Sequence, residues 1–179
     1  ASTIAMSGGV LDADESSTVS GALSHTADIT IDVADNKTLT YSGAAISLGA
    51  NTLTLSGGGS LVSGGLTLND ASSKLLLNSI TVDNVSTSAD SLGLDVNADS
   101  TVTSLLVANI TPVAIASGSS LFGGITVSAG SIKLAEAGTV ASTIAMSGGT
   151  LDADETSTVS GALSHTADIT IDVADNKTL

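Results

Sequence analysis

Two clusters of carboxylate side chains are the part of this chain whose residue types and spacing could do chemistry. The first lies in LDADES and the second in DVADNK, and their oxygen-bearing members are Asp12, Asp14, Glu15, Asp32, Asp35 and Asn36. The first cluster recurs later in the chain as Asp152, Asp154 and Glu155. Oxygen ligands at this density suit Ca²⁺, which takes six to eight of them. These six residues therefore predict calcium binding, and no other cofactor is expected.

The chain lacks the two common calcium-binding motifs, so a second interpretation of the carboxylates stays open. The EF-hand pattern, with its glycine and its terminal glutamate, is absent from both clusters. The nonapeptide of calcium-binding β-rolls is absent too, because SGGGSLVSGG contains no aspartate. In the second interpretation, the carboxylates form turns and keep a long acidic protein in solution.

Residue types that could act in catalysis are scarce. His25 is the single histidine of the segment 1–140 and recurs as His165, and the chain has neither cysteine nor arginine. Serine is abundant, but the GxSxG pattern of a hydrolase nucleophile does not occur. His25 lies in the turn-like stretch ALSHTAD, where a solvated turn residue is the simplest interpretation. We therefore expect the protein not to be an enzyme.

Composition excludes several further classes of protein. Eighteen carboxylates against four lysines give a formal net charge of −14, and the chain has one Tyr, one Phe and no Trp. It thus lacks the positive charge and the aromatic side chains with which proteins bind nucleic acids. No apolar run is long enough to cross a membrane as a helix. With 42% hydrophobic and 12% charged residues, the chain does not have the composition of a disordered protein.

The carboxylates and the histidine belong to a long internal repeat. Residues 141–179 match residues 1–39 at 37 of 39 positions, and only Val10/Thr150 and Ser16/Thr156 differ. The chain therefore divides into one complete repeat, 1–140, and the start of a second, 141–179. Because both ends interrupt the repeat, we expect the chain to be a piece of a longer tandem array.

Short runs of alternating apolar and polar residues fill this repeat. Examples are ADITIDVAD, NTLTLSGG and GITVSAG, each of them bounded by Gly, Ser, Ala, Asn or Asp. Alternation with period two is typical of β-strands, and no stretch shows the helical period over three turns. We therefore expect an all-β protein.

A second spacing groups these strands into coils. A Thr or Ser followed by an apolar residue recurs with the apolar anchors Val19, Leu39, Val102, Leu121, Val140 and Val159. Successive anchors are 19 or 20 residues apart, except that Leu39 and Val102 are 63 residues apart. The longer distance accommodates three coils of about 21 residues. The spacing predicts a parallel β-helix (β-solenoid) with about seven coils of about 20 residues in each 140-residue repeat. At about 4.8 Å per coil, one repeat should rise about 34 Å.

The chain resembles the repetitive stalks of bacterial extracellular β-solenoid proteins, such as filamentous haemagglutinin, autotransporter passengers and giant adhesins. The resemblance rests on the Thr/Ser–apolar anchors, the SGGxL turns at residues 7–11 and 147–151, and the near-identical 140-residue copies. It implies an extracellular or cell-surface location and a non-enzymatic role. No motif specific to one of these families occurs, so the resemblance assigns no residue a role.

Two functions are carried forward as hypotheses. The first is a structural component of a long extracellular fibre or cell-surface stalk, in which copies of the chain associate end to end or side by side. The second is an adhesin that binds glycans or a cell surface through one solenoid face, for which residues 47–100 would have to supply a non-repeating patch. A carbohydrate-active β-helix enzyme is a third class. Such enzymes combine clustered carboxylates with Arg or Lys and aromatic sugar platforms, whereas this chain has no Arg or Trp.

Overall fold

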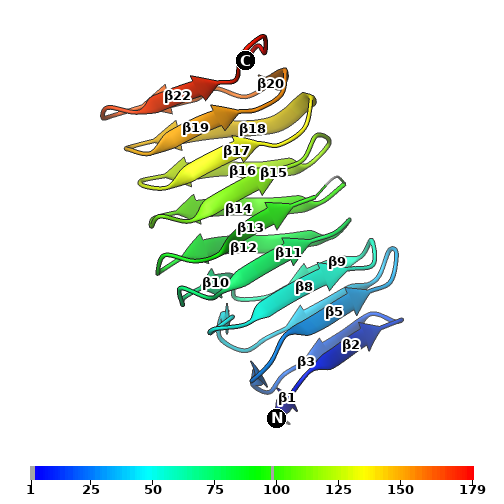
Figure 1. The fold of residues 1–179 in the computed structure, drawn as a ribbon. Helices are drawn as coiled ribbons and strands as arrows, with labels where there is room; N and C mark the ends of the chain where they lie inside the picture. Colours follow the sequence, from blue (N-terminus) through cyan, green and yellow to red (C-terminus); the bar gives the residue numbers. More distant parts are fainter. Residues whose placement is uncertain (1–2, 98) are drawn as a thin grey trace.

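The computed structural model describes residues 3–97 and 99–179, which form a column of short strands with the two ends of the chain at opposite ends of the column (Figure 1). These residues contain twenty-two β-strands and no helix, and the strands pair in parallel from one coil to the next. The predicted all-β parallel β-helix is therefore confirmed. No helix long and apolar enough to cross a membrane occurs in this described part of the chain.

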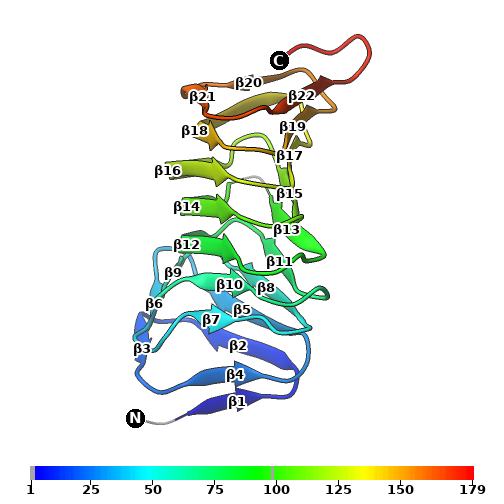
Figure 2. The same cartoon turned by 90° about the vertical axis from the view of Figure 1, so that its left-hand side faces the viewer.

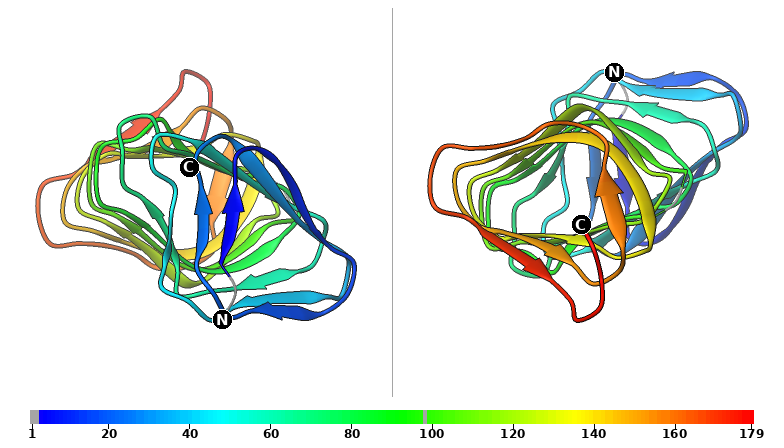
Figure 3. Two further views of the ribbon diagram at one scale, coloured as in Figure 1. Left: turned by 90° about the horizontal axis from the view of Figure 1, so that it is seen from below. Right: turned by 90° about the horizontal axis from the view of Figure 1, so that it is seen from above.

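One face of the column is a nine-stranded parallel sheet, to which each successive coil adds one strand. Its strands are β2 (Gly9–Ala13), β5 (Ile29–Val33), β8 (Thr52–Ser56), β11 (Lys74–Leu77), β13 (Gly93–Val96), β15 (Pro112–Ile115), β17 (Ser131–Leu134), β19 (Thr150–Ala153) and β22 (Thr170–Val173). Nine strands mark eight turns of the solenoid, and hydrogen bonds between coils join residues 18 to 24 positions apart. Seen end on, the coils wind around one interior (Figure 3), and their buried apolar residues form a single core.

The other two sides of the column begin as separate strands. They are β1 (Ile4–Met6), β4 (Leu23–His25), β7 (Ile46–Ser47) and β10 (Leu66–Leu68) on one side, and β3 (Ser17–Val19), β6 (Thr38–Tyr41) and β9 (Ser60–Val62) on the other. Figure 2 shows the first group stacked below β12. From there the two sides share single long strands, namely β12 (Thr81–Thr87), β14 (Thr101–Val107), β16 (Ser120–Val127) and β18 (Gly138–Met146). They separate again into β20 (Ser157–Val159) and β21 (Leu163–His165), which both pair with β18.

The core is built from the alternating apolar residues of these strands. On the nine-stranded face, one inward column contains Leu53, Leu75, Leu94, Val113, Ile132 and Leu151, and all six are fully buried. Burial of an aliphatic side chain of this size stabilises the folded state by about 1.5–3 kcal/mol. Each coil therefore adds its own stabilising layer to a continuous apolar core.

The predicted anchor spacing is confirmed for the middle of the chain. Leu39, Leu61, Val82, Val102 and Leu121 lie opposite one another in successive coils, so three coils do fill the interval between Leu39 and Val102. Val140 also lies opposite Val159, as its spacing predicts.

Two neighbouring pairs of anchors are not equivalent, and here the prediction was wrong. Val19 lies opposite Tyr41 and not Leu39, and Leu121 lies opposite Ser142 and not Val140. In the second case β16 has two residues more than β18 between successive pairs, because Leu121 and Ile125 face Ser142 and Ile144. A β-bulge of this kind changes the strand register without changing the alternation of inward and outward residues on either side.

Candidate functional site

Two of the predicted calcium ligands lie side by side on the nine-stranded face. Asp12 in β2 is directly opposite Asp32 in β5, and both residues are on the outer surface of the sheet. The same pair recurs in the second copy as Asp152 and Asp172. The next residue along this column is Ser56, whose hydroxyl donates a hydrogen bond to the Asp32 carboxylate. Like charges opposite each other destabilise a sheet, so a cation between the two carboxylates would stabilise this position.

The other four candidates lie in the turns that follow these strands. Glu15 accepts a hydrogen bond from the Lys37 ammonium at 2.6 Å, and the pair recurs as Lys177 and Glu155 at 2.5 Å. Asn36 has a φ of 61°, in the left-handed region that asparagine tolerates better than most residues. Asp14 and Asp35 are exposed neighbours of these two residues. The geometry therefore supports a turn-forming role for Asn36 and an ionic role for Glu15.

The six candidates do not form one compact group. Among the residues that the structure describes, no set of three or more histidine, aspartate or glutamate side chains is arranged to hold a metal ion. Two residues of the six are adjacent across a pair of strands, and the rest belong to the turns. Calcium binding at Asp12, Asp14, Glu15, Asp32, Asp35 and Asn36 stays a prediction.

The lysines have a structural role that the sequence pattern did not reveal. Each of the four pairs with a carboxylate from a neighbouring coil, and the pairs are Lys37–Glu15, Lys74–Asp95, Lys133–Asp154 and Lys177–Glu155. The partners are 21 or 22 positions apart in the sequence, which is about one turn of the solenoid. Opposite charges about one coil apart are candidates for such pairs, but the number of residues in each coil decides which of them meet.

The ion pair at Lys133 changes the protonation of the residues around it. The hydrogen bond and the charge of Asp154 raise the pKa of Lys133, and the same hydrogen bond lowers the pKa of Asp154. Asp152 behaves differently, because partial burial and then the negative charge of Asp154 raise the pKa of its carboxyl. Lys133 therefore neutralises the charge of Asp154, whereas the ionised form of the nearby Asp152 is disfavoured.

His25 lies at the end of strand β4 and not in a turn, as its sequence context had suggested. Its ring nitrogen Nδ1 donates to the backbone carbonyl of Ala27 at 3.2 Å. The same contact joins His165 to Ala167 at 3.3 Å, which indicates that it is a property of the repeated sequence. This hydrogen bond ties the histidine to the loop that leads into the next strand.

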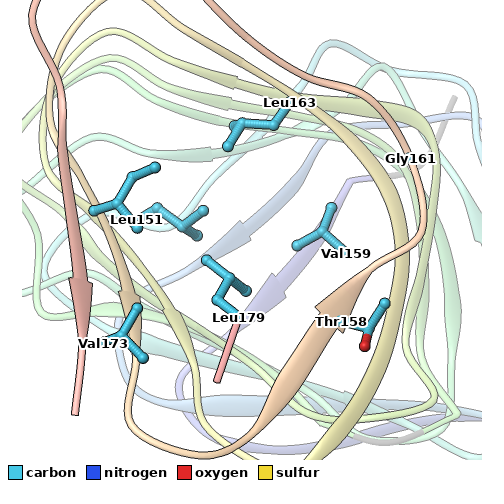
Figure 4. Close-up of a pocket in the computed structure, with 8 residues that line it drawn as sticks. Leu151, Thr158, Val159, Gly161, Leu163, Val173 and Leu179 are labelled. Atoms are coloured by element: carbon cyan, nitrogen blue, oxygen red, sulfur yellow. The ribbon is translucent and has the colours of Figure 1, made fainter. Parts of the chain in front are cut away.

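An apolar hollow of about 410 Å³ lies at the C-terminal end of the column. Figure 4 shows Leu151, Leu163 and Leu179 around this space. Ile171, Val173 and Val159 also line it, so the hollow is the open end of the apolar core.

Comparisons with protein-family models, with curated proteins and with solved structures found no match to this chain. Its function therefore has to be inferred from its own residues and geometry.

Proposed function

We propose that the protein is a structural component of a long extracellular fibre or cell-surface stalk, built from tandem 140-residue solenoid repeats and without enzymatic activity. The observation that carries this proposal is that both copies of the repeated sequence stack in the same local register. Leu11 lies opposite Ile31 in the first copy, and Leu151 lies opposite Ile171 in the second. Further copies would therefore lengthen the rod and leave its cross-section unchanged.

The contacts between coils suit a load-bearing rod. Backbone hydrogen bonds join each strand to the next along the axis, and a pull along this axis loads several of them in parallel. The ion pairs of Lys74 with Asp95 and of Lys37 with Glu15 also cross from one coil to another. In such a solenoid the total stability is approximately the sum of the contributions of the coils and of the interfaces between them.

Surface charge would control how such rods associate side by side. All four lysines are already paired with carboxylates of their own chain, and the formal net charge is −14. Neighbouring rods should therefore repel each other unless divalent cations lie between them. We expect bundles to separate when EDTA is added and to reform with excess Ca²⁺; bundles that are unaffected by EDTA would contradict this part of the proposal.

Electron microscopy of the native material tests the fibre itself. Pairing along the nine-stranded face leads in seven steps from Gly9 to Leu151, which corresponds to an axial distance of about 34 Å. A thin unbranched fibre with this repeat, or a multiple of it, is the expected result. Compact particles without an axial repeat would overturn the proposal.

An adhesin that binds glycans or a cell surface is the second candidate, and one observation favours it. Leu92 and Ile110, which precede β13 and β15, are 61% and 70% exposed at one corner of successive coils. If this corner binds a surface, replacing both residues by serine should abolish attachment to cells or to a glycan array. The matched control is Val10→Ser, because Val10 is 62% exposed on another part of the rod.

A further inference from the structure

The two methionines of the sequence lie directly opposite its two histidines. Met6 in β1 is opposite His25 in β4, and Met146 in β18 is opposite His165 in β21. The members of each pair come from neighbouring coils, and such strands lie about 4.8 Å apart in a sheet. Because the sequence contains no cysteine, the two methionines are also its only sulfur-bearing side chains.

Both members of a pair lie on the inner side of their strands. Met6 and His25 are less exposed than Ala5 and Ser24, the residues that precede them on β1 and β4. Met146 is 2% exposed and belongs to the apolar core. Figure 2 shows β4 stacked on β1. The register and the burial pattern therefore place a thioether and an imidazole side by side.

The histidine is held in an orientation that suits a metal ligand. Nδ1 of His25 donates to the carbonyl oxygen of Ala27 at 3.2 Å, and His165 makes the same bond to Ala167 at 3.3 Å. Because a carbonyl only accepts, the proton of the neutral ring is on Nδ1 and the lone pair is on Nε2. Histidines that bind metals usually donate their other ring N–H in this way.

Nε2 of His25 has no other use in the fold. It is buried, and no atom in the part of the chain that the structure describes makes a hydrogen bond to it. Burial of a polar atom without a partner costs free energy. A ligand that accepts the lone pair would remove this cost, and the residue opposite, Met6, offers a second lone pair on its sulfur.

We propose that each of the two pairs, Met6–His25 and Met146–His165, binds one Cu(I) ion through the methionine Sδ and the histidine Nε2. Thioether sulfur and imidazole nitrogen both suit this ion. Ca²⁺ takes oxygen ligands and Zn²⁺ about four ligands, so neither fits a pair of this kind. Both side chains are neutral, and the formal net charge of −14 favours the approach of a cation. Each further copy of the repeat would add one such site.

The methionine methyl groups give a direct test, because the 179-residue chain contains only two of them. The chain is labelled with ¹³C at these methyl groups and titrated with Ag⁺, which shares the ligand preferences of Cu(I) and is stable in air. The variants Met6→Leu and Met146→Leu assign the two NMR signals. We expect both signals to shift until one equivalent per pair has been added. Signals that stay in place, or that move only in large excess of Ag⁺, would overturn the proposal.

Replacing one histidine at a time separates a paired site from binding by methionine alone. In His25→Gln, the Ag⁺ concentration that shifts the Met6 signal should rise at least about tenfold, which corresponds to about 1.4 kcal/mol. The Met146 signal should respond as before, so it serves as the control for folding within the same sample. His165→Gln should give the opposite result. If Met6 responds equally with and without His25, the proposed pairing is wrong.

Competition with the chelator bicinchoninate, under anaerobic conditions with ascorbate, measures Cu(I) itself. We expect one ion per pair in the parent chain and none in the double variant Met6→Leu, Met146→Leu. The matched control is Asp12→Asn, Asp32→Asn, which removes two carboxylates and should bind as much Cu(I) as the parent chain. Binding that survives in the methionine variant but is lost in the carboxylate variant would overturn the proposal. The fibre proposal is read from an axial repeat and not from metal binding, so either can fail without the other.

Discussion

The hydroxyl oxygen of Tyr41 accepts a hydrogen bond from the backbone N–H of Leu23, 3.1 Å away, at a place where two neighbouring coils do not pair. Leu23 belongs to β4, and within residues 3–97 and 99–179 β4 pairs only with β1, whereas β7 in the next coil pairs only with β10. The tyrosine is 6% exposed and its side chain lies towards the core. Its hydroxyl thus takes the place of a backbone acceptor at an interruption of the sheet.

Replacing Tyr41 by phenylalanine should therefore lower the free energy of unfolding by about 1–2 kcal/mol, because the N–H of Leu23 loses its acceptor. Urea denaturation of the variant and the parent chain measures this difference. The matched control is Thr126→Val, which removes an exposed hydroxyl from β16 and should change the stability little. If the two variants are equally stable, the hydrogen bond of Tyr41 contributes nothing.

Asp152→Asn should stabilise the protein at neutral pH. Burial and the charge of Asp154 raise the pKa of Asp152, so its ionised form is less favourable in the folded state than in the unfolded state. The resulting loss of stability is present above the raised folded pKa and disappears as the pH falls below the ordinary value of 3.8. Because solvent screens this carboxylate, we expect a gain of about 0.5 kcal/mol or less at pH 7.

Thermal melting between pH 3 and pH 7 measures the effect of this substitution. The matched control is Asp12→Asn, since Asp12 is the same residue in the first copy but, among the strands that the structure describes, has a neighbour on one side only, β5. The gain should be larger for Asp152, which lies between β17 and β22. A gain that persists unchanged at pH 3 would show that it does not come from the charge.

Lys133→Gln should destabilise the protein at neutral pH through the loss of its ion pair with Asp154. The pair lowers the pKa of Asp154, so its contribution is present above 3.8 and is lost as the pH falls through the lowered pKa. The pair also raises the pKa of Lys133, so the contribution is present below 10.5 and is lost as the pH rises through the raised pKa. The destabilisation should therefore be largest between these limits. A double-mutant cycle with Asp154→Asn isolates the pair, and a coupling that does not vary with pH would contradict this assignment.

The fold could be predicted because it depends on a short-range pattern. Alternation with period two places Leu53, Leu75 and Leu94 on the inner face, and their regular spacing of one coil stacks them in one column. Both signals are properties of the repeated strands and do not depend on the turns. Leu92 is an exception to this alternation. It continues the pattern of Leu94 and Val96, but its side chain is 61% exposed, because it precedes the first residue of β13 and lies in the corner between strands.

Register and ion pairs could not be predicted because they depend on the number of residues in each coil. Gly9 and Leu151 lie on the same inward column, although the residue equivalent to Leu151 in the first copy is Leu11. The two copies therefore differ by two positions across this face, and a shift by two preserves which residues point inward. Of the candidate site, the pairing of Asp12 with Asp32 follows from their spacing of one coil. The partner of Glu15 and the turn conformation of Asn36 depend on the shape of the turns and emerge only from the structure.

Calcium should raise the melting temperature if the predicted carboxylates bind it. A ligand that binds only the folded state stabilises it by about 2.7 kcal/mol at a concentration one hundred times its dissociation constant. We expect the shift to disappear with EDTA and to shrink in the double variant Asp12→Asn, Asp32→Asn, because these two carboxylates lie opposite each other. Asp83→Asn, which removes a carboxylate outside the predicted set, is the control. A melting temperature that is the same in millimolar Ca²⁺ and in EDTA would show that the carboxylates only form turns.

The same substitution made in the two copies measures what one covering coil contributes. Ile31 and Ile171 have the same neighbours in sequence, but Ile31 is covered by Leu55 and fully buried, whereas Ile171 is 48% exposed. Ile31→Ala should cost about 2–5 kcal/mol, because it removes buried methyl groups and leaves a cavity. Ile171→Ala should cost less than about 1 kcal/mol, since most of the removed surface already contacts water. Urea denaturation of the two variants gives both values. Equal costs would mean that another chain covers Ile171 in solution. In that case, dilution of the sample should lower the cost of Ile171→Ala and leave the cost of Ile31→Ala unchanged.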